Sequence, residues 1–233
     1  MPIFSIPASG LQTSILRQSV SANNLANLDT NGFKSFRLDQ ATVKGGGAAA
    51  TGTSRDQSQG ALRTDTGHRA SAAIVGNGQF RVQTPDGERF TRDGGFHINA
   101  NGQVVTANGE PLADGIVAPP NSSSVRFASD GTATASNGQQ VGQVELAKFN
   151  NPDALVEEGG NQAAATAGSG PAMVGAPGTG GRGKIVTGAV EVSNVNPITE
   201  TVELMKSRVA IEANIEVLDA QDQTLETLLG IRR

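Results

Sequence analysis

The most constraining feature of this chain is that helical periodicity occurs only at its two ends. Near the C-terminus, four apolar residues recur at intervals of seven: Leu204, Ile211, Leu218 and Leu225. This heptad spacing is typical of a helix that packs along a partner helix. Asn196 fits the N-cap, Pro197 the first helical position and Gly230 the end of a helix of about 32 residues.

A second, shorter helix is predicted near the N-terminus. Its stripe consists of residues three or four positions apart: Leu11, Ile15, Gln18, Ala22 and Leu25. Ser9 and Gln12 fit a capping box at its start. A partner helix of about 20 residues is too short to cover the C-terminal stripe, which spans roughly 48 Å at the standard helical rise. We therefore expect other copies or other chains to cover the remainder.

Between the two helical ends, short β-type runs alternate with turn dipeptides. QFRVQT precedes PDGE, and SVRFA precedes SDGT. Asp-Gly and Asn-Gly between alternating runs are the strongest hairpin signal in a single sequence. The sequence therefore predicts an α+β fold in which an all-β domain is inserted between terminal helices.

Two stretches rich in Gly, Ala and Ser interrupt this pattern. They cover residues 44–60 and 159–183 and contain almost no side chains that could be buried in a core. We interpret both as linkers or mobile loops.

Composition excludes several classes of function. Aromatic residues make up 3% of the chain, all of them Phe, and the net charge is -4, so a nucleic-acid partner is not expected. Cysteine is absent, which excludes a disulfide framework and a thiol nucleophile. No stretch of 18 apolar residues occurs, so neither a membrane span nor a Sec signal peptide is expected.

Candidate chemical sites are weak. GTGGRGKI, at residues 178–185, resembles a phosphate-binding loop but has Ile185 where magnesium binding needs Ser or Thr. Neither histidine, His68 or His97, has an evident second metal ligand, and His97 fits a solvent-facing strand position. The acidic run of the C-terminal helix fits a solvated or interface face. We expect no catalytic residue, metal or cofactor.

Asparagines gather at the end of the N-terminal helix. Asn23, Asn24 and Asn27 lie about one turn apart, and Asn31-Gly32 follows as a turn signal. These amides fit a helix C-terminus whose side chains cap carbonyl groups. They equally fit an interface in which buried amides fix the register of packed helices.

Three stretches resemble the bacterial flagellar rod and hook proteins. They are SANNLANLDTNGFKS near the N-terminus, a central stretch with TRDGGF, and the terminal segment that begins VEVSNVNP. The positions that match the family pattern are Asn23, Asn24, Leu25, Ala26, Asn27, Thr30, Gly32, Phe33, Lys34, Thr91, Arg92, Asp93, Gly94, Phe96, Glu191, Ser193, Asn194, Val195, Asn196, Arg208, Glu212, Ala213 and Asn214. Gln79 departs from the pattern, since the family commonly has an aromatic residue there.

The resemblance implies a subunit with two parts. Residues 1–43 and 191–233 would form a coiled-coil inner domain, residues 44–61 a flexible linker, and residues 62–190 an all-β outer domain with the loop 159–183. The implied function is a structural, non-enzymatic subunit of the basal-body rod, closest to the distal or next-to-distal rod proteins. The alternatives are a hook or other axial protein, or a secreted β-domain binding module with coiled-coil termini.

The resemblance also implies partners and a location. The subunit would contact copies of itself, adjacent rod and hook proteins, the surrounding ring proteins and the flagellar type III export apparatus, without a cleaved signal peptide. Its place would be the basal body, crossing the periplasm. The residues expected at the assembly interface are Asn23, Asn24, Leu25, Asn27, Gly32, Phe33, Asn194, Leu204, Arg208, Ile211, Glu212, Asn214, Leu218 and Leu225.

Overall fold

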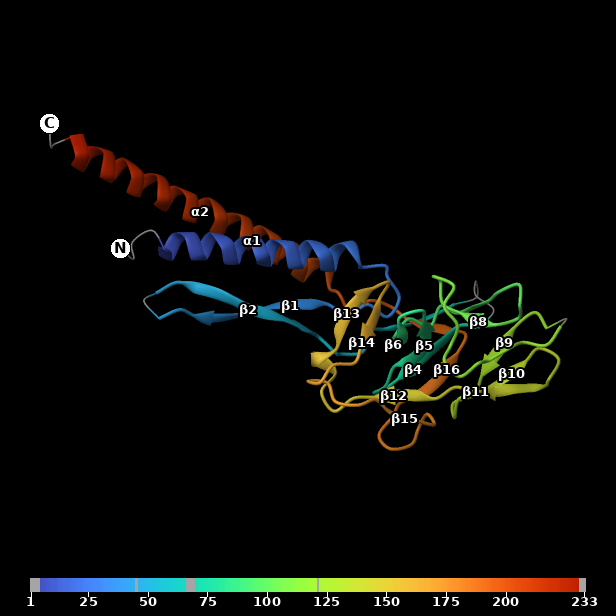
Figure 1. Cartoon of the computed structure of the whole chain (residues 1–233). Coiled ribbons are helices and arrows are strands. Elements are labelled where there is room, and N and C mark those ends of the chain that lie inside the picture. Colours follow the sequence, from blue (N-terminus) through green and yellow to red (C-terminus); the bar gives the residue numbers. More distant parts are fainter. Residues whose placement is uncertain (1–4, 45, 66–69, 121, 231–233) are drawn as a thin grey trace. The chain divides into compact units, whose positions relative to one another are not determined.

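The computed structural model describes residues 5–44, 46–65, 70–120 and 122–230. The chain divides into two compact units (Figure 1). The helical unit combines Met1–Leu28, Ser35–Asp56 and Val195–Arg233, and the β unit combines Asp29–Lys34 and Gln57–Asn194. The chain is therefore α+β, as predicted, and residues 29–34 fold with the strands although the sequence suggested that they belong with the helix.

Two helices pack together in the helical unit. Helix α2 spans Pro197–Gly230 and has 34 residues, whereas α1 spans Ser5–Ala26 and has 22. The predicted N-cap of α2 is confirmed, because Asn196 Oδ1 accepts hydrogen bonds from the backbone N–H groups of Ile198 at 3.0 Å and Thr199 at 3.3 Å.

The predicted capping box of α1 is wrong. Helix α1 is already formed at Ser5, so Ser9 lies inside it, and the Ser9 hydroxyl donates to the carbonyl of Ile6 at 2.9 Å. A serine four residues into a helix turns back to a carbonyl of the preceding turn instead of capping an N–H group.

A β-hairpin completes the helical unit. Strand β1, Phe36–Thr42, pairs antiparallel with β2, Ala48–Arg55, and the register shifts between Asp39 and Gln40. The hydroxyl of Thr13 on α1 donates to the carbonyl of Ala48 at 3.0 Å. We expected a flexible linker over residues 44–61, whereas β2 occupies the middle of this range. Strand pairing uses backbone groups, so this Ala-, Thr- and Gly-rich segment forms a ribbon without large side chains.

The β unit contains short strands and one 3₁₀ turn, η1, at Pro152–Ala154. The strands are β3 Leu62–Thr64, β4 Ala72–Val75, β5 Phe80–Thr84, β6 Gly87–Thr91, β7 His97–Ile98, β8 Val104–Val105, β9 Val125–Phe127, β10 Thr132–Ala135, β11 Gln140–Gln143, β12 Leu146–Lys148, β13 Val156–Gly159, β14 Gln162–Ala164, β15 Met173–Gly175, β16 Lys184–Thr187 and β17 Ala189–Glu191. The largest sheet has the order β13-β14-β6-β5. The predicted hairpin at Asp86-Gly87 is confirmed as β5–β6.

The β unit has its own apolar core. Phe80 and Phe96 meet edge to face with ring centroids 5.0 Å apart, and both are 1% exposed. A second cluster contains Phe90 and Phe149, whose centroids are 4.8 Å apart. Such clusters supply the burial that holds short strands together.

The Gly- and Ala-rich stretch at 159–183 is more ordered than a mobile loop. Strands β14 and β15 lie within it, and between them the Thr166 hydroxyl donates to Ala154 O at 2.7 Å. Ser169 is fully buried and its hydroxyl accepts from Thr166 N at 2.9 Å. Local hydroxyl bonds of this kind fix a turn without a hydrophobic side chain.

Candidate assembly surface and motif junction

The two helices of the helical unit bury small and polar side chains. The buried residues of α1 are Pro7, Thr13, Ser14, Ser21 and Asn24, and Ser207 is the one buried residue in the described part of α2. A Cβ on Gly10 would lie 2.8 Å from Asn214 Oδ1, so glycine permits a close approach of the two helices. This surface selects an alignment more than it supplies hydrophobic burial.

The predicted apolar stripes are only partly used in this contact. Leu204, Ile211 and Leu218 are half-buried, as is Leu25, whereas Leu225 is 42% exposed. The stripe predicted for α1 is displaced by one position, because Ile15 is 50% exposed while the preceding Ser14 is buried. An apolar pattern locates a helix better than it locates the face that packs.

Helix α2 carries an uncovered apolar stripe on its other side. Ile198, Val202, Met205 and Val209 follow each other at intervals of four, three and four, and they are 76%, 43%, 62% and 64% exposed. Ser207 lies nine positions after Ile198, about half a turn away around the helix. The stripe therefore faces away from the side of α2 that packs on α1.

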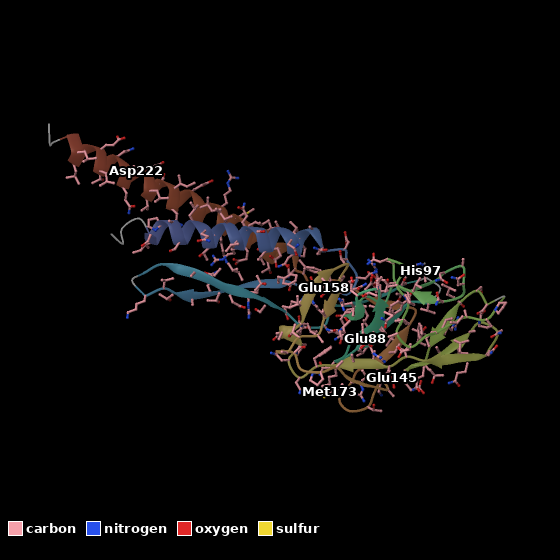
Figure 2. All side chains as sticks on the ribbon, viewed as in Figure 1. Glu88, His97, Glu145, Glu158, Met173 and Asp222 are labelled. Carbon is pink, nitrogen blue, oxygen red and sulfur yellow. The ribbon has the colours of Figure 1, made fainter. Side chains whose placement is uncertain are left out.

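The second half of α2 is acidic. Carboxylates stand at Glu212, Glu216, Asp219, Asp222 and Glu226, and the sequence has no Lys or Arg from Val209 to Gly230 (Figure 2 labels Asp222). Since α1 has 22 residues and α2 has 34, the C-terminal end of α2 extends beyond α1 (Figure 1), and Leu228 and Leu229 are 59% and 66% exposed.

The expected charged interface residues of α2 pair with each other. Arg208 Nε lies 2.9 Å from Glu212 Oε1, and the two side chains are 76% and 62% exposed. An exposed pair at this spacing adds only a few tenths of a kcal/mol to the helix. Asn214 instead donates to Ala210 O at 2.7 Å while it packs over Gly10.

The amides at the end of α1 divide into two kinds. Asn24 is 1% exposed: its Nδ2 donates to Phe36 O at 2.8 Å and to Glu200 Oε1 at 2.9 Å, and its Oδ1 accepts from Phe36 N at 2.8 Å. It thus joins α1, β1 and α2 of one subunit. Asn23 is exposed, and Asn27 donates to Asn23 O at 2.9 Å, as at an ordinary helix C-terminus.

In the β unit, all three family-like stretches meet at one buried carboxylate. Glu191 is fully buried and pairs with Lys34, while its Oε2 lies 3.6 Å from Arg92 Nη1. Its Oε1 also accepts from Gly60 N at 3.0 Å, and Lys34 donates to Ser58 O at 2.7 Å. Burial lowers the pKa of Arg92, and Glu191 opposes this shift. We call this set the motif junction.

Three expected interface residues lie beside this junction. Gly32 has φ +68°, and a Cβ there would lie 2.5 Å from the Arg92 carbonyl carbon, so the site requires glycine. Phe33 is 5% exposed, and its carbonyl accepts from Asn194 N at 3.3 Å. Gly32 and Phe33 are buried in the interior of one subunit, and Asn194 is half-buried. The sequence does not reveal the ion pair, because Lys34 and Glu191 stand 157 positions apart.

The described residues show no candidate metal centre. They contain no group of three His, Cys, Asp or Glu side chains that could hold a metal. His97 is half-buried in β7 beside Val105 of β8, and His68 lies outside the described residues. In the phosphate-loop-like stretch, the Arg182 guanidinium donates to Thr179 Oγ1 at 3.0 Å.

One charged cluster lies on the β5–β6 hairpin. Arg81 Nε lies 2.6 Å from Glu88, and Arg81 Nη1 lies 3.2 Å from both Asp114 and Glu145. Burial raises the pKa of Asp114 to about 6, against the lowering effects of the Glu145 N–H and of Arg81. Arg81 of β5 thus contacts strand β6 and two loops.

Neither helix in the described part of the chain combines the length and hydrophobicity that a membrane span requires.

Known proteins match the chain at both ends and in the middle. Residues 6–34 match the family described as flagella basal body rod protein, residues 73–135 the flagellar hook protein FlgE/F/G D1 domain, and residues 186–231 the flagellar basal body rod FlgEFG protein C-terminal family. The flagellar basal-body rod protein FlgG of Buchnera aphidicola (subsp. Baizongia pistaciae) is 35% identical over 98% of both chains. This chain belongs to the bacterial flagellar rod and hook protein family.

Other members of the flagellar rod and hook family are also similar to this chain over most of its length. The rod protein FlgG of Caulobacter vibrioides is 32% identical over 97% of both chains. The rod protein FlgF of the same organism is also 32% identical, over 86% of this chain and 85% of its own. The FlgE/F/G D1 model falls within the β unit, and the two terminal models include α1 apart from Ser5 and the whole of α2.

Proposed function

We propose that this chain is a structural subunit of the flagellar basal-body rod that assembles into a helical tube. The tube transmits torque and surrounds the export channel, and the subunit acts without catalysis. The observation that carries this proposal is the exposed apolar stripe of α2, Ile198 to Val209, on the side away from α1. Only neighbouring chains can bury that stripe.

The partners follow from the same role. Copies of this chain cover the α2 stripe, adjacent rod and hook proteins continue the tube, and the ring proteins surround it. The type III export apparatus delivers the chain, and the rod crosses the periplasm. Relatives named FlgG align over nearly the whole chain, which favours the longer, distal or next-to-distal type of rod protein.

The assembly residues are assigned accordingly. Leu204, Ile211, Leu218 and Leu225 contribute the side of α2 that α1 covers incompletely. Arg208 and Glu212 lie on the exposed surface that neighbours reach. Asn24 and Asn214 fix the geometry of α1 against α2, so that each copy presents the same surface.

A substitution in the stripe tests this function. Val209→Asp places a charge on a side chain that is 64% exposed, so the monomer should fold normally and polymerisation should be lost. Val209→Leu is the matched control and should polymerise. Sedimentation and electron microscopy measure the polymer, and circular dichroism checks the fold. Leu218→Asp, on the side facing α1, should also abolish polymers while the β unit stays folded.

Normal polymers from Val209→Asp would contradict the proposal. The β-domain binding module with coiled-coil termini predicts a small oligomer of fixed size, whereas a rod subunit forms an open-ended polymer whose mass grows with concentration.

A further inference from the structure

Every Asn-Gly pair of the chain lies in the β unit. The pairs begin at Asn31, Asn77, Asn101, Asn108 and Asn137. Asn-Gly is the dipeptide most prone to deamidation, because glycine has no side chain that would hinder its backbone nitrogen from attacking the asparagine amide. The reaction needs a glycine nitrogen that can give up its proton. The fold therefore decides which pairs can react.

Four of the pairs have a glycine N–H that is held by a backbone hydrogen bond. Gly102, Gly109 and Gly138 each close a tight turn, because each donates at 2.9 Å to the carbonyl of the residue three positions earlier. Gly32 is buried and donates to Glu191 O at 2.6 Å. Loss of the proton would break these hydrogen bonds. The fold thus protects these four pairs.

The pair Asn77-Gly78, between β4 and β5, differs from the other four. Among the residues that the structure describes, no group accepts a hydrogen bond from Gly78 N, and none bonds to the Asn77 side chain. Asn77 is exposed and Gly78 is half-buried, so water can reach the pair. Both the attacking nitrogen and the amide that it attacks are therefore available.

The peptide group of this pair is also polarised in the direction that the reaction requires. When the glycine nitrogen loses its proton, the negative charge is shared with the carbonyl oxygen of the same peptide group, which belongs to Asn77. That oxygen accepts a hydrogen bond from Gly183 N at 2.6 Å. A hydrogen bond to the charged form favours it, so this contact assists loss of the proton.

Cations lie close to the pair. Asn77 and Gly78 line a hollow of about 250 Å³ together with Arg92 and Lys148, and none of its lining residues is acidic. The Arg92 guanidinium donates through Nη2 to Gly76 O at 2.7 Å, one residue before the pair. Positive charges nearby stabilise the anionic nitrogen and the carboxylate of the product.

We propose that Asn77 is a site of spontaneous deamidation through the backbone nitrogen of Gly78, an inference that is independent of the rod function. The nitrogen passes its proton to a base in the solvent and attacks Asn77 Cγ, forming an N–Cγ bond. The Cγ–Nδ2 bond then breaks, and Nδ2 takes up a proton from water and leaves as ammonia. Water opens the resulting succinimide ring to aspartate or isoaspartate. The reaction needs no oxidant or cofactor, and it adds a negative charge beside the cations of the hollow.

Peptide mapping by mass spectrometry tests this site, because the other Asn-Gly pairs of the same chain are its controls. The full-length wild-type protein is incubated at mildly alkaline pH, both folded and in urea. In the folded protein, Asn77 should convert at least about fivefold faster than any other pair, the factor that one backbone hydrogen bond supplies. In urea the rates should converge, because the glycine nitrogens are then all exposed to water. Isoaspartate at residue 77, detected by enzymatic methylation, identifies the succinimide route.

Two variants test the chemistry and the surroundings of the pair. Asn77→Gln keeps an exposed amide whose longer side chain does not form the succinimide, so isoaspartate should disappear at this residue while the circular dichroism spectrum stays unchanged. Lys148→Gln removes a cation from the hollow, so Asn77 should convert more slowly. Lys206→Gln, on α2, is the matched control and should leave the rate unchanged.

Three results would contradict the inference. Equal rates at all pairs of the folded protein, or an earlier reaction at another pair, would overturn it. A preference for Asn77 that persists in urea would also overturn it, because the local sequence and not the fold would then be the cause. A wild-type rate in Lys148→Gln would overturn its electrostatic part.

Discussion

In the β unit most of the largest fully buried side chains are apolar, as at Ile74, Phe80 and Phe96, whereas the two helices of the helical unit bury Ser14 and Ser207. The apolar side chains of α2 lie largely in solvent. A unit with its own core can be stable alone, because burial of each large side chain contributes roughly 1.5 to 3 kcal/mol. The helical unit has less of this contribution, and we propose that burial of the α2 stripe by neighbouring copies supplies the remainder.

The two units also use their buried polar groups differently. In the β unit, Glu191 is enclosed and holds two cations from distant parts of the chain. In the helical unit, Asn24 joins three elements through hydrogen bonds. Glu191 therefore stabilises a buried interior. Asn24 fixes how the helices and the hairpin are arranged in a unit whose α2 surface stays exposed.

The largest expected effect comes from breaking the motif junction. Glu191→Leu leaves Lys34 and Arg92 buried without their carboxylate, so the β unit should lose about 3 to 5 kcal/mol in its free energy of unfolding. Urea denaturation followed by circular dichroism measures the loss. The control is Glu203→Gln, which removes the exposed pair with Lys206 and should change stability by less than about 1 kcal/mol. Equal effects of the two variants would show that the junction is not a closed interior.

A smaller effect is expected from the amide of the helical unit. Asn24→Ala removes three hydrogen bonds, two of them to the Phe36 backbone, at a cost of about 1 to 3 kcal/mol. In thermal unfolding followed by circular dichroism, the variant should lose its helix signal at a lower temperature than the wild type. Asn23→Ala, one position earlier and exposed, is the control and should stay within about 0.5 kcal/mol of the wild type. Identical melting of both variants would remove Asn24 from its structural role.

The start of α2 provides a test of about 1 kcal/mol. Asn196→Ala removes the acceptor for Ile198 N and Thr199 N, so the first turn of α2 should fray. Amide hydrogen exchange should accelerate in that turn and remain unchanged in the β unit. Faster exchange in the β-unit core would contradict a role of Asn196 that is confined to the start of α2.

The smallest effect concerns pH and is confined to the β unit. Burial raises the pKa of Asp114 to about 6, so the folded state favours the protonated form. The stability from this group is therefore present below its unfolded pKa near 4 and is lost as pH rises through 6. After allowance for solvent screening, the loss is on the order of 1 kcal/mol.

Asp114→Asn should abolish this loss when urea midpoints are compared between pH 4 and 7. Asp130→Asn is the control, because hydrogen bonds from Thr132 lower the pKa of Asp130, so its contribution is already present above the unfolded pKa near 4 and the loss between pH 4 and 7 should remain. The same pH slope in Asp114→Asn and in the wild type would exclude Asp114 as the titrating group.

Local signals in the sequence predicted most of the elements. Asn196 and Pro197 mark the start of α2, and the Asp86-Gly87 turn marks the β5–β6 hairpin, because these features depend on residues a few positions apart. The β1–β2 hairpin escaped prediction because pairing of backbones leaves little trace in an Ala- and Gly-rich segment. Residues close together in the sequence were enough to predict helices and hairpins, but not how these elements pack.

The candidate sites were less accessible from the sequence. The packing face of α1 contains Ser14 and not the predicted Ile15. The sequence does not show this, because glycine and serine at a close helix contact do not produce an apolar stripe. The junction of Lys34, Arg92 and Glu191 depends on three segments that only the fold brings together.

The central claim is that the β unit is complete in one copy and the helical unit is completed by assembly. Amide hydrogen exchange on the full-length protein, compared between monomer and polymer, tests it most directly. The account predicts slow exchange in β4 to β6 in both states, with fast exchange along α2 in the monomer that becomes slow in the polymer. Slow exchange along the whole of α2 in a monomer, at any concentration, would contradict it.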